Sequence, residues 1–142
     1  MIPAQPEPKR FSWRVRVYYE DTDAGGVVYY ANYLKFFERA RTEWLRSFGL
    51  NQDKLREEAG QIFVVRRALL DFVRPARLDD LLDVTVEPKK LARVYVDLAQ
   101  EARRGEELLA RAEIRVACLD EKSLKPALVP AVLQGIAASA RA

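Results

Sequence analysis

The chain has 142 residues, of which 49% are hydrophobic and 32% are charged, and it carries a formal net charge of +3. This length suits one domain with a single core, and the composition is that of a globular protein rather than a disordered one. Basic residues are interleaved with acidic ones, so we expect no nucleic-acid partner. No run approaches the roughly 20 apolar residues of a membrane span, so we expect no membrane insertion.

Residues 1–10 contain three prolines and no apolar stretch. We therefore expect a flexible N-terminal arm rather than a secretory signal. The single cysteine, Cys118, cannot form an internal disulfide and is typical of a reducing compartment, so we expect a cytoplasmic protein. Because Cys118 falls in the apolar register of a predicted strand, we interpret it as a packed core thiol rather than a nucleophile.

The first half of the chain predicts one strand and two helices. Strict alternation of apolar and polar residues over 11–19 predicts a half-buried strand. Apolar residues at three- and four-residue spacing then predict an amphipathic helix over 32–48, with Asn32 as its N-cap and Gly49 as its C′ residue. A weaker helix is predicted over 52–59, ending at Gly60.

The second half predicts strands only, at 62–72, 82–87, 94–99 and 108–118. The first of these is expected to keep its even-numbered apolar residues on one face, interrupted at Arg66. A turn over 103–106 makes the last two strands antiparallel neighbours.

This order of elements predicts an α+β fold in which an antiparallel sheet of five or six strands wraps around one long helix. We expect the domain to span 11–130, followed by a small, apolar C-terminal tail over 131–142. The sheet leaves an edge available, so we also expect a homo-oligomer, a dimer or a dimer of dimers, that continues the sheet.

The chain contains no histidine. That excludes a Ser-His-Asp or Cys-His arrangement and makes a zinc site improbable. No Gly-rich phosphate loop or dinucleotide fingerprint is present. We therefore expect no metal and no bound cofactor, and any chemistry must come from carboxylates, tyrosines, backbone amides and basic residues.

The segment over 18–33 combines acidic residues, paired glycines and a helix start. The unsatisfied N–H groups of a helix N-terminus can hold a developing oxyanion. A carboxylate just before them could attack a carbonyl or activate water. These residues alone leave a second interpretation open, in which the Asp-rich Gly-Gly loop only shapes a turn.

The block Tyr-Tyr-Glu-Asp-Thr-Asp-Ala-Gly-Gly-Val-Val-Tyr over 18–29 continues through Ala-Asn-Tyr at 31–33 and Phe-Glu-Arg-Ala-Arg-Thr-Glu at 37–43. Together with Phe-Val-Val-Arg at 63–66 and Pro-Ala-Arg-Leu-Asp-Asp at 75–80, it closely resembles the 4-hydroxybenzoyl-CoA thioesterase family. Within that family the resemblance is strongest to the Tol–Pal system-associated acyl-CoA thioesterases. The resemblance implies a hot-dog fold and thioester hydrolysis.

In that family the second Asp of the Asp-x-Asp loop is the catalytic carboxylate, which corresponds to Asp23 here. The resemblance also implies that the backbone N–H of Tyr30 polarises the thioester carbonyl and that Gly25, Gly26 and Tyr29 border the substrate. The Tol–Pal-associated proteins commonly have a histidine where Tyr30 stands. A backbone N–H survives that change, so the difference concerns substrate choice more than activity.

The resemblance further places Lys89, Lys90 and Arg93 where the family binds the phosphates of CoA. A solvated hairpin is the competing interpretation of this basic cluster. Glu38, on the long helix, is interpreted as a helix-face residue bordering the site, although some hot-dog enzymes keep their catalytic group there.

We therefore expect an acyl-CoA thioesterase, assembled as a homotetramer, that hydrolyses small or medium acyl groups with Asp23 as nucleophile or general base. One alternative is a non-hydrolysing scaffold of an envelope complex that binds acyl-CoA or acyl carrier protein. Another is a hot-dog dehydratase, which would normally need a histidine that this chain lacks.

Overall fold

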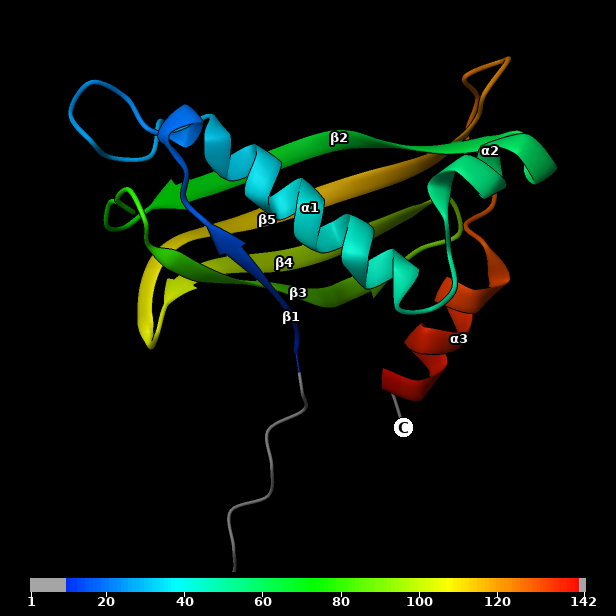
Figure 1. The fold of residues 1–142 in the computed structure, drawn as a ribbon. Coiled ribbons are helices and arrows are strands. Elements are labelled where there is room, and N and C mark those ends of the chain that lie inside the picture. Colours follow the sequence, from blue (N-terminus) through cyan, green and yellow to red (C-terminus); the bar gives the residue numbers. More distant parts are fainter. Residues whose placement is uncertain (1–9, 141–142) are drawn as a thin grey trace, which may run out of the picture.

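The structure, a computed structural model, describes residues 10–140, so the predicted N-terminal arm lies outside the described residues except for Arg10. Five antiparallel strands form one sheet in the order β1-β3-β4-β5-β2 and curve around one long helix (Figure 1). The strands are β1 (Phe11–Arg16), β2 (Gln61–Phe72), β3 (Leu81–Leu91), β4 (Tyr95–Arg104) and β5 (Glu107–Asp120). The helices are α1 (Asn32–Arg46), α2 (Gln52–Ala59) and α3 (Ala131–Ala140). The predicted α+β architecture is confirmed.

The core lies between α1 and the concave face of the sheet. The predicted apolar stripe of α1 is buried, as its spacing requires: Tyr33, Phe36, Phe37, Ala40, Trp44 and Leu45. It packs in one cluster with alternate residues of the strands, among them Val15, Leu82, Val84, Val86, Val96, Leu98 and Ile114. Burial of each large side chain contributes about 1.5–3 kcal/mol, so this seam is the main stabilising feature of the fold.

The predicted ends of the long helix are wrong in detail. Asn32 is the first helical residue rather than the N-cap, which is Ala31 and makes no side-chain capping bond. The Asn32 side-chain amide instead donates to the carbonyl of Asp21 at 2.8 Å, so it ties the preceding loop to the helix. At the other end α1 stops at Arg46, with Ser47 as C-cap, and Gly49 adopts a left-handed φ of 80° two residues later.

The first strand is shorter than its alternation predicts. It ends at Arg16, and Tyr19–Asp21 form a short 3₁₀ turn instead. The turn is stabilised by the Asp21 carboxylate, which accepts a hydrogen bond from the Tyr18 backbone N–H at 2.8 Å. Val15 and Val17 are buried as expected, whereas Tyr19 is 81% exposed because the chain has already left the sheet.

The prediction of one apolar face along β2 is also wrong. Its pairing with β5 shifts register between Val65 and Arg67, which is a β-bulge. An inserted residue reverses the faces of all residues beyond it. Phe63 therefore faces the core before the bulge and Leu70 after it.

The last described segment forms a helix that the sequence did not predict. Ala131–Ala140, within the expected tail, is α3, and its Leu133 is fully buried in the core. The predicted domain boundaries stay a prediction. None of the helices in the described part of the chain is long and apolar enough to span a membrane.

Candidate active site

The loop before α1 is a small hairpin whose turn begins at Asp23. Thr22 and Val28 form an antiparallel bridge. The Asp23 N–H donates to the Val27 carbonyl at 2.9 Å, and the Gly26 N–H donates to the Asp23 carbonyl at 3.0 Å. Gly26 has a φ of 78°, a left-handed conformation that a side chain would strain. The backbone around Asp23 is therefore fixed by its own hydrogen bonds.

The two aspartates of the Asp-x-Asp loop have different surroundings. Asp21 is 3% exposed, and its carbonyl also accepts from the Tyr29 N–H at 2.9 Å, so Asp21 supports the loop. Asp23 is exposed. Its Oδ1 accepts a hydrogen bond from the Gly25 N–H at 2.8 Å, while its Oδ2 accepts none from any residue in the described part of the chain. A Cβ on Gly25 would lie 3.2 Å from Oδ1, so glycine leaves room for this oriented carboxylate.

The start of α1 offers a backbone donor next to this hairpin. The N–H groups of Asn32 and Tyr33 donate to the carbonyls of Tyr29 and Tyr30 at 2.8 Å and 3.3 Å. The Tyr30 N–H donates to no acceptor within residues 10–140. An unused N–H at a helix N-terminus carries positive partial charge and can bind a carbonyl oxygen or an oxyanion.

Aromatic side chains form a shallow groove of about 260 Å³ beside this helix start, lined by Val28, Tyr30, Tyr33, Phe72, Val73, Arg74 and Pro75. The ring centroids of Tyr29 and Tyr30 are 4.8 Å apart, and those of Tyr30 and Phe72 are 6.1 Å apart. A hydrogen bond with the Tyr30 hydroxyl raises the pKa of Tyr29. Phe72 was predicted only as a strand residue, because its approach to the helix start depends on the β2 bulge.

Tyr33 supports the groove from below. Its hydroxyl oxygen accepts a hydrogen bond from the Ala76 N–H at 3.1 Å. Burial raises the pKa of Tyr33 above its usual value, so the phenol stays protonated. We interpret Tyr33 as a positioning residue. From the sequence alone, Tyr33 was predicted only as a core residue of the helix.

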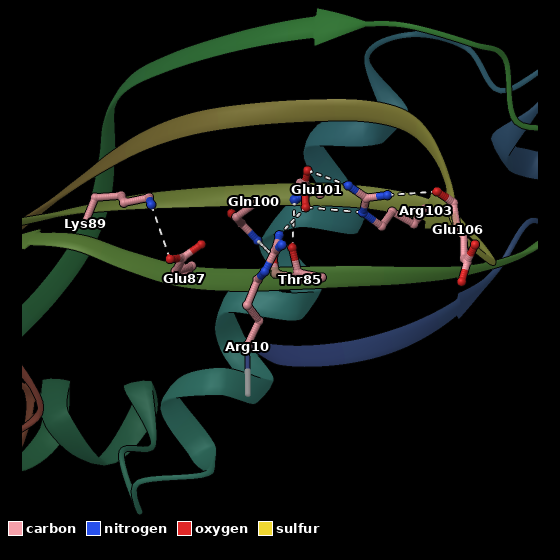
Figure 2. A network of polar contacts seen from close by, with 8 residues as sticks. All are labelled: Arg10, Thr85, Glu87, Lys89, Gln100, Glu101, Arg103 and Glu106. Carbon is pink, nitrogen blue, oxygen red and sulfur yellow. Dashed lines mark hydrogen bonds and ion pairs between the residues drawn. The ribbon is translucent and has the colours of Figure 1, made fainter. Parts of the chain in front are cut away.

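The predicted basic cluster lies at the end of β3, which holds Lys89 and Lys90, and in the turn before β4, which holds Arg93. Lys89 Nζ is 3.2 Å from Glu87 Oε1, and Figure 2 shows this pair beside a polar network that joins Arg10, Thr85, Glu101 and Arg103. Lys90 Nζ lies 5.5 Å from the centre of the Tyr95 ring, and its hydrogen bond lowers the pKa of Tyr95. The Arg93 side chain is exposed and forms no ion pair with any described residue.

Within one chain, the hairpin and the basic cluster lie far apart. The hairpin lies at the start of β3, where the Val28 N–H donates to the Ala76 carbonyl at 2.8 Å. Lys89 and Lys90 lie near the far end of β3 (Leu81–Leu91) and Arg93 follows it. Eight residue steps separate Leu81 from Lys89, which is about 26 Å at ~3.3 Å per residue. Figure 1 shows the two at opposite ends of the sheet.

Cys118 and Glu38, the two other candidate residues, do not serve as reactive groups at the hairpin. Cys118 is buried, its Sγ donates to the Leu128 carbonyl, and burial raises the pKa of its thiol, as expected for a core residue. Glu38 is exposed on α1, and its Oε1 accepts a hydrogen bond from the Thr42 hydroxyl at 2.8 Å.

Comparisons with known proteins agree on one family. The model of the thioesterase-like superfamily matches residues 17–136. The chain is 48% identical over 120 residues to acyl-CoA thioesterase YbgC of Haemophilus influenzae, covering 84% of this chain and 88% of that protein. It is 46% identical over 121 residues to acyl-CoA thioester hydrolase YbgC of Escherichia coli, covering 84% and 90%. The crystal structure of a probable thioesterase from Bartonella henselae is similar, with a TM-score of 0.81 and 37% identity, covering 86% of this chain and all of that one. The chain therefore belongs to the thioesterase-like superfamily and has its hot-dog fold.

Proposed function

We propose that this protein hydrolyses the thioester of a small or medium acyl-CoA to the free acid and CoA, with Asp23 as the catalytic carboxylate. The observation that carries the proposal is an oriented, exposed carboxylate with one free oxygen, in the hairpin that precedes a helix start with an unused N–H. The family match and the relatives named acyl-CoA thioesterase support this reaction class. The single cysteine favours a cytoplasmic location.

The reaction follows from these two groups. The Tyr30 N–H binds the thioester carbonyl oxygen and stabilises the charge that develops on it. Asp23 then attacks the carbonyl carbon, the C–S bond breaks and CoA leaves as the thiolate. Water hydrolyses the resulting anhydride to the acid and the Asp23 carboxylate, and a proton released in that step converts the thiolate to the thiol. Alternatively, Asp23 removes a proton from a water molecule that attacks the same carbon, the C–S bond breaks, and the proton passes from Asp23 to the leaving sulfur. Both routes give the same products, and Gly25, Gly26 and Tyr29 border the path of the substrate.

A second copy of the chain completes this proposed site. β2 is an edge strand with exposed apolar residues, including Val65, Leu69 and Phe72, and Leu69 is 57% exposed. Such an edge favours pairing with another strand. Two β2 strands related by a two-fold axis would run antiparallel, which places the hairpin end of one sheet beside the basic-cluster end of the other. Lys89, Lys90 and Arg93 of one copy could then bind the CoA phosphates while Asp23 of the other acts on the thioester, in a dimer or a dimer of dimers.

The test is free-thiol release from a panel of acyl-CoAs, from acetyl to decanoyl and including benzoyl, with purified protein. We expect turnover on at least one member, with a single preferred range of acyl size. Tight binding of acyl-CoA without thiol release on any member would contradict hydrolysis and favour the non-hydrolysing scaffold.

A further inference from the structure

A second cavity lies along the C-terminal half of α1, away from the hairpin. It has a volume of about 160 Å³, and its apolar walls are Trp44, Leu45, Phe63, Val65, Val96, Leu98, Val116 and Leu133. The remaining lining residues are polar: Glu38, Arg41, Thr42 and Gln52. A cavity of about 150 Å³ can hold a benzene-sized molecule, so this one has room for about six carbon atoms.

Arg41 is the unusual residue of this cavity, because it is only 9% exposed and stands in the apolar stripe of α1. Its Nη1 donates to Gln100 Oε1 at 2.9 Å. The Gln100 amide is fixed in turn, since its Nε2 donates to the Phe37 carbonyl at 3.0 Å. A guanidinium has five N–H donors, and none of the others reaches an acceptor within residues 10–140.

The charge of Arg41 also lacks a close counter-ion. No carboxylate of the described residues lies within ion-pair distance of its guanidinium. Burial lowers the pKa of Arg41, and the more distant Glu38 acts in the opposite direction. No buried side-chain nitrogen in the described part of the chain lacks a hydrogen-bond partner, so the remaining nitrogens of Arg41 keep contact with solvent and are open to the anion of a ligand.

The polar residues at the rim leave Arg41 available. Gln52 Nε2 donates to the Thr42 hydroxyl at 3.3 Å, and that hydroxyl donates to Glu38 at 2.8 Å. Glu38 also lines the cavity, and its carboxylate is engaged there by the Thr42 hydroxyl. The cavity combines apolar walls with one oriented polar anchor, which is the usual make-up of a small-molecule site.

We propose that this cavity binds a short carboxylate, with its chain of about six carbons against the apolar walls and its carboxylate on the free N–H groups of Arg41. The source of this carboxylate is the acid released by hydrolysis, so this part of the inference rests on the proposed function. An acyl group of this length that is still attached to CoA at Tyr30 would not reach Arg41, because nine helical residues, about 13.5 Å, separate Asn32 from Arg41.

Calorimetric titration with hexanoate and with hexan-1-ol tests the site itself, because the two probes share a chain but differ in charge. Hexanoate should bind the wild-type protein more tightly than hexan-1-ol. Arg41→Met should weaken hexanoate binding about ten- to a hundredfold, Arg41→Lys should weaken it less, and hexan-1-ol should be unaffected. Arg39→Met, which removes an exposed arginine of the same helix, is the matched control and should bind hexanoate like the wild type.

A measurement on the wild-type protein keeps the test valid if Arg41→Met does not fold. Hexanoate should shift the NMR signal of the Arg41 Nε–H, while hexan-1-ol should leave it nearly unchanged. Equal binding of the two probes, or hexanoate binding that leaves Arg41 unshifted, would overturn the proposal.

Kinetics then test whether the released acid is the ligand. If the cavity holds the released acid, hexanoate should inhibit hydrolysis of hexanoyl-CoA by the wild type but not by Arg41→Met. Equal inhibition of the two proteins would contradict this source. Absence of all hydrolysis would contradict the proposed function, whereas the binding titration would still decide this inference.

Discussion

The two ends of β3 hold their polar groups in opposite ways. At the hairpin end the backbone is fixed by its own hydrogen bonds, and Asp23 and the Tyr30 N–H are left available. At the other end Lys89 is paired with Glu87 and Lys90 lies on Tyr95, so these long side chains must be drawn away before they can bind anything else. Fixed groups suit a catalytic site, and flexible cations suit phosphate binding. We therefore propose that the hairpin carries out catalysis and that the basic cluster binds the phosphates of CoA.

The hairpin should show the largest effect. Asp23→Asn keeps the shape of the side chain and removes its charge, so turnover should fall by about two to four orders of magnitude. The melting temperature should hardly change, because the Asp23 side chain is exposed. Asp21→Ala is the contrast, since it leaves the Tyr18 N–H without its acceptor and should cost about 1–3 kcal/mol of unfolding free energy. Turnover by Asp23→Asn within a few-fold of the wild type would make Asp23 a loop residue.

The Tyr30 donor gives the next effect. Tyr30→Pro removes the N–H at a position near a helix start where proline is tolerated, so kcat should fall about 10²–10³-fold. Tyr30→Phe and Tyr30→His keep the N–H and should keep most activity. Circular dichroism of the Pro variant must first show a wild-type spectrum. If Tyr30→Phe is as damaging as Tyr30→Pro, the phenol rather than the backbone is the catalytic group.

Changes in the basic cluster should have the smallest effect, and they should alter KM rather than kcat. Reversing Lys89 and Lys90 to Glu should raise KM for acyl-CoA about fivefold with little change in kcat, because ground-state and transition-state contacts are lost alike. A pantetheine thioester, which lacks the nucleotide, should show a smaller change. Reversal of Lys54 and Lys122 makes the same change in net charge elsewhere and is the control. An equal effect on both substrates would exclude the lysines as phosphate ligands.

Local patterns in the sequence predicted the parts of this molecule that depend on local structure. The α1 stripe, the five strands, the β4–β5 hairpin and Gly60 at the end of α2 all depend on spacing or on turn residues, and the structure confirms them. The loop around Asp23 was recognisable from its turn residues and from the family resemblance, but its pairing as a hairpin was not predicted.

Features that depend on distant contacts were not predictable in this way. Asn32 is a good N-cap by residue type, but its side-chain amide donates a hydrogen bond to the Asp21 carbonyl instead of capping the helix. The bulge in β2 depends on its register with β5, so alternation assigned the wrong faces. Arg41 lies four residues after Phe37 and four before Leu45, so helical spacing did place a charge in the apolar stripe; its meaning required the cavity and Gln100.

The central claim is that Asp23 of one copy and the basic cluster of another act on the same acyl-CoA. It is tested most directly by purified mixed dimers, made by co-expressing Asp23→Asn with a chain in which Lys89, Lys90 and Arg93 are changed to Glu. Each mixed dimer then contains one site with both elements intact. At low acyl-CoA concentration we predict about half of the wild-type activity per dimer, well above the mean of the two parent variants. Activity equal to that mean would contradict a site shared between copies.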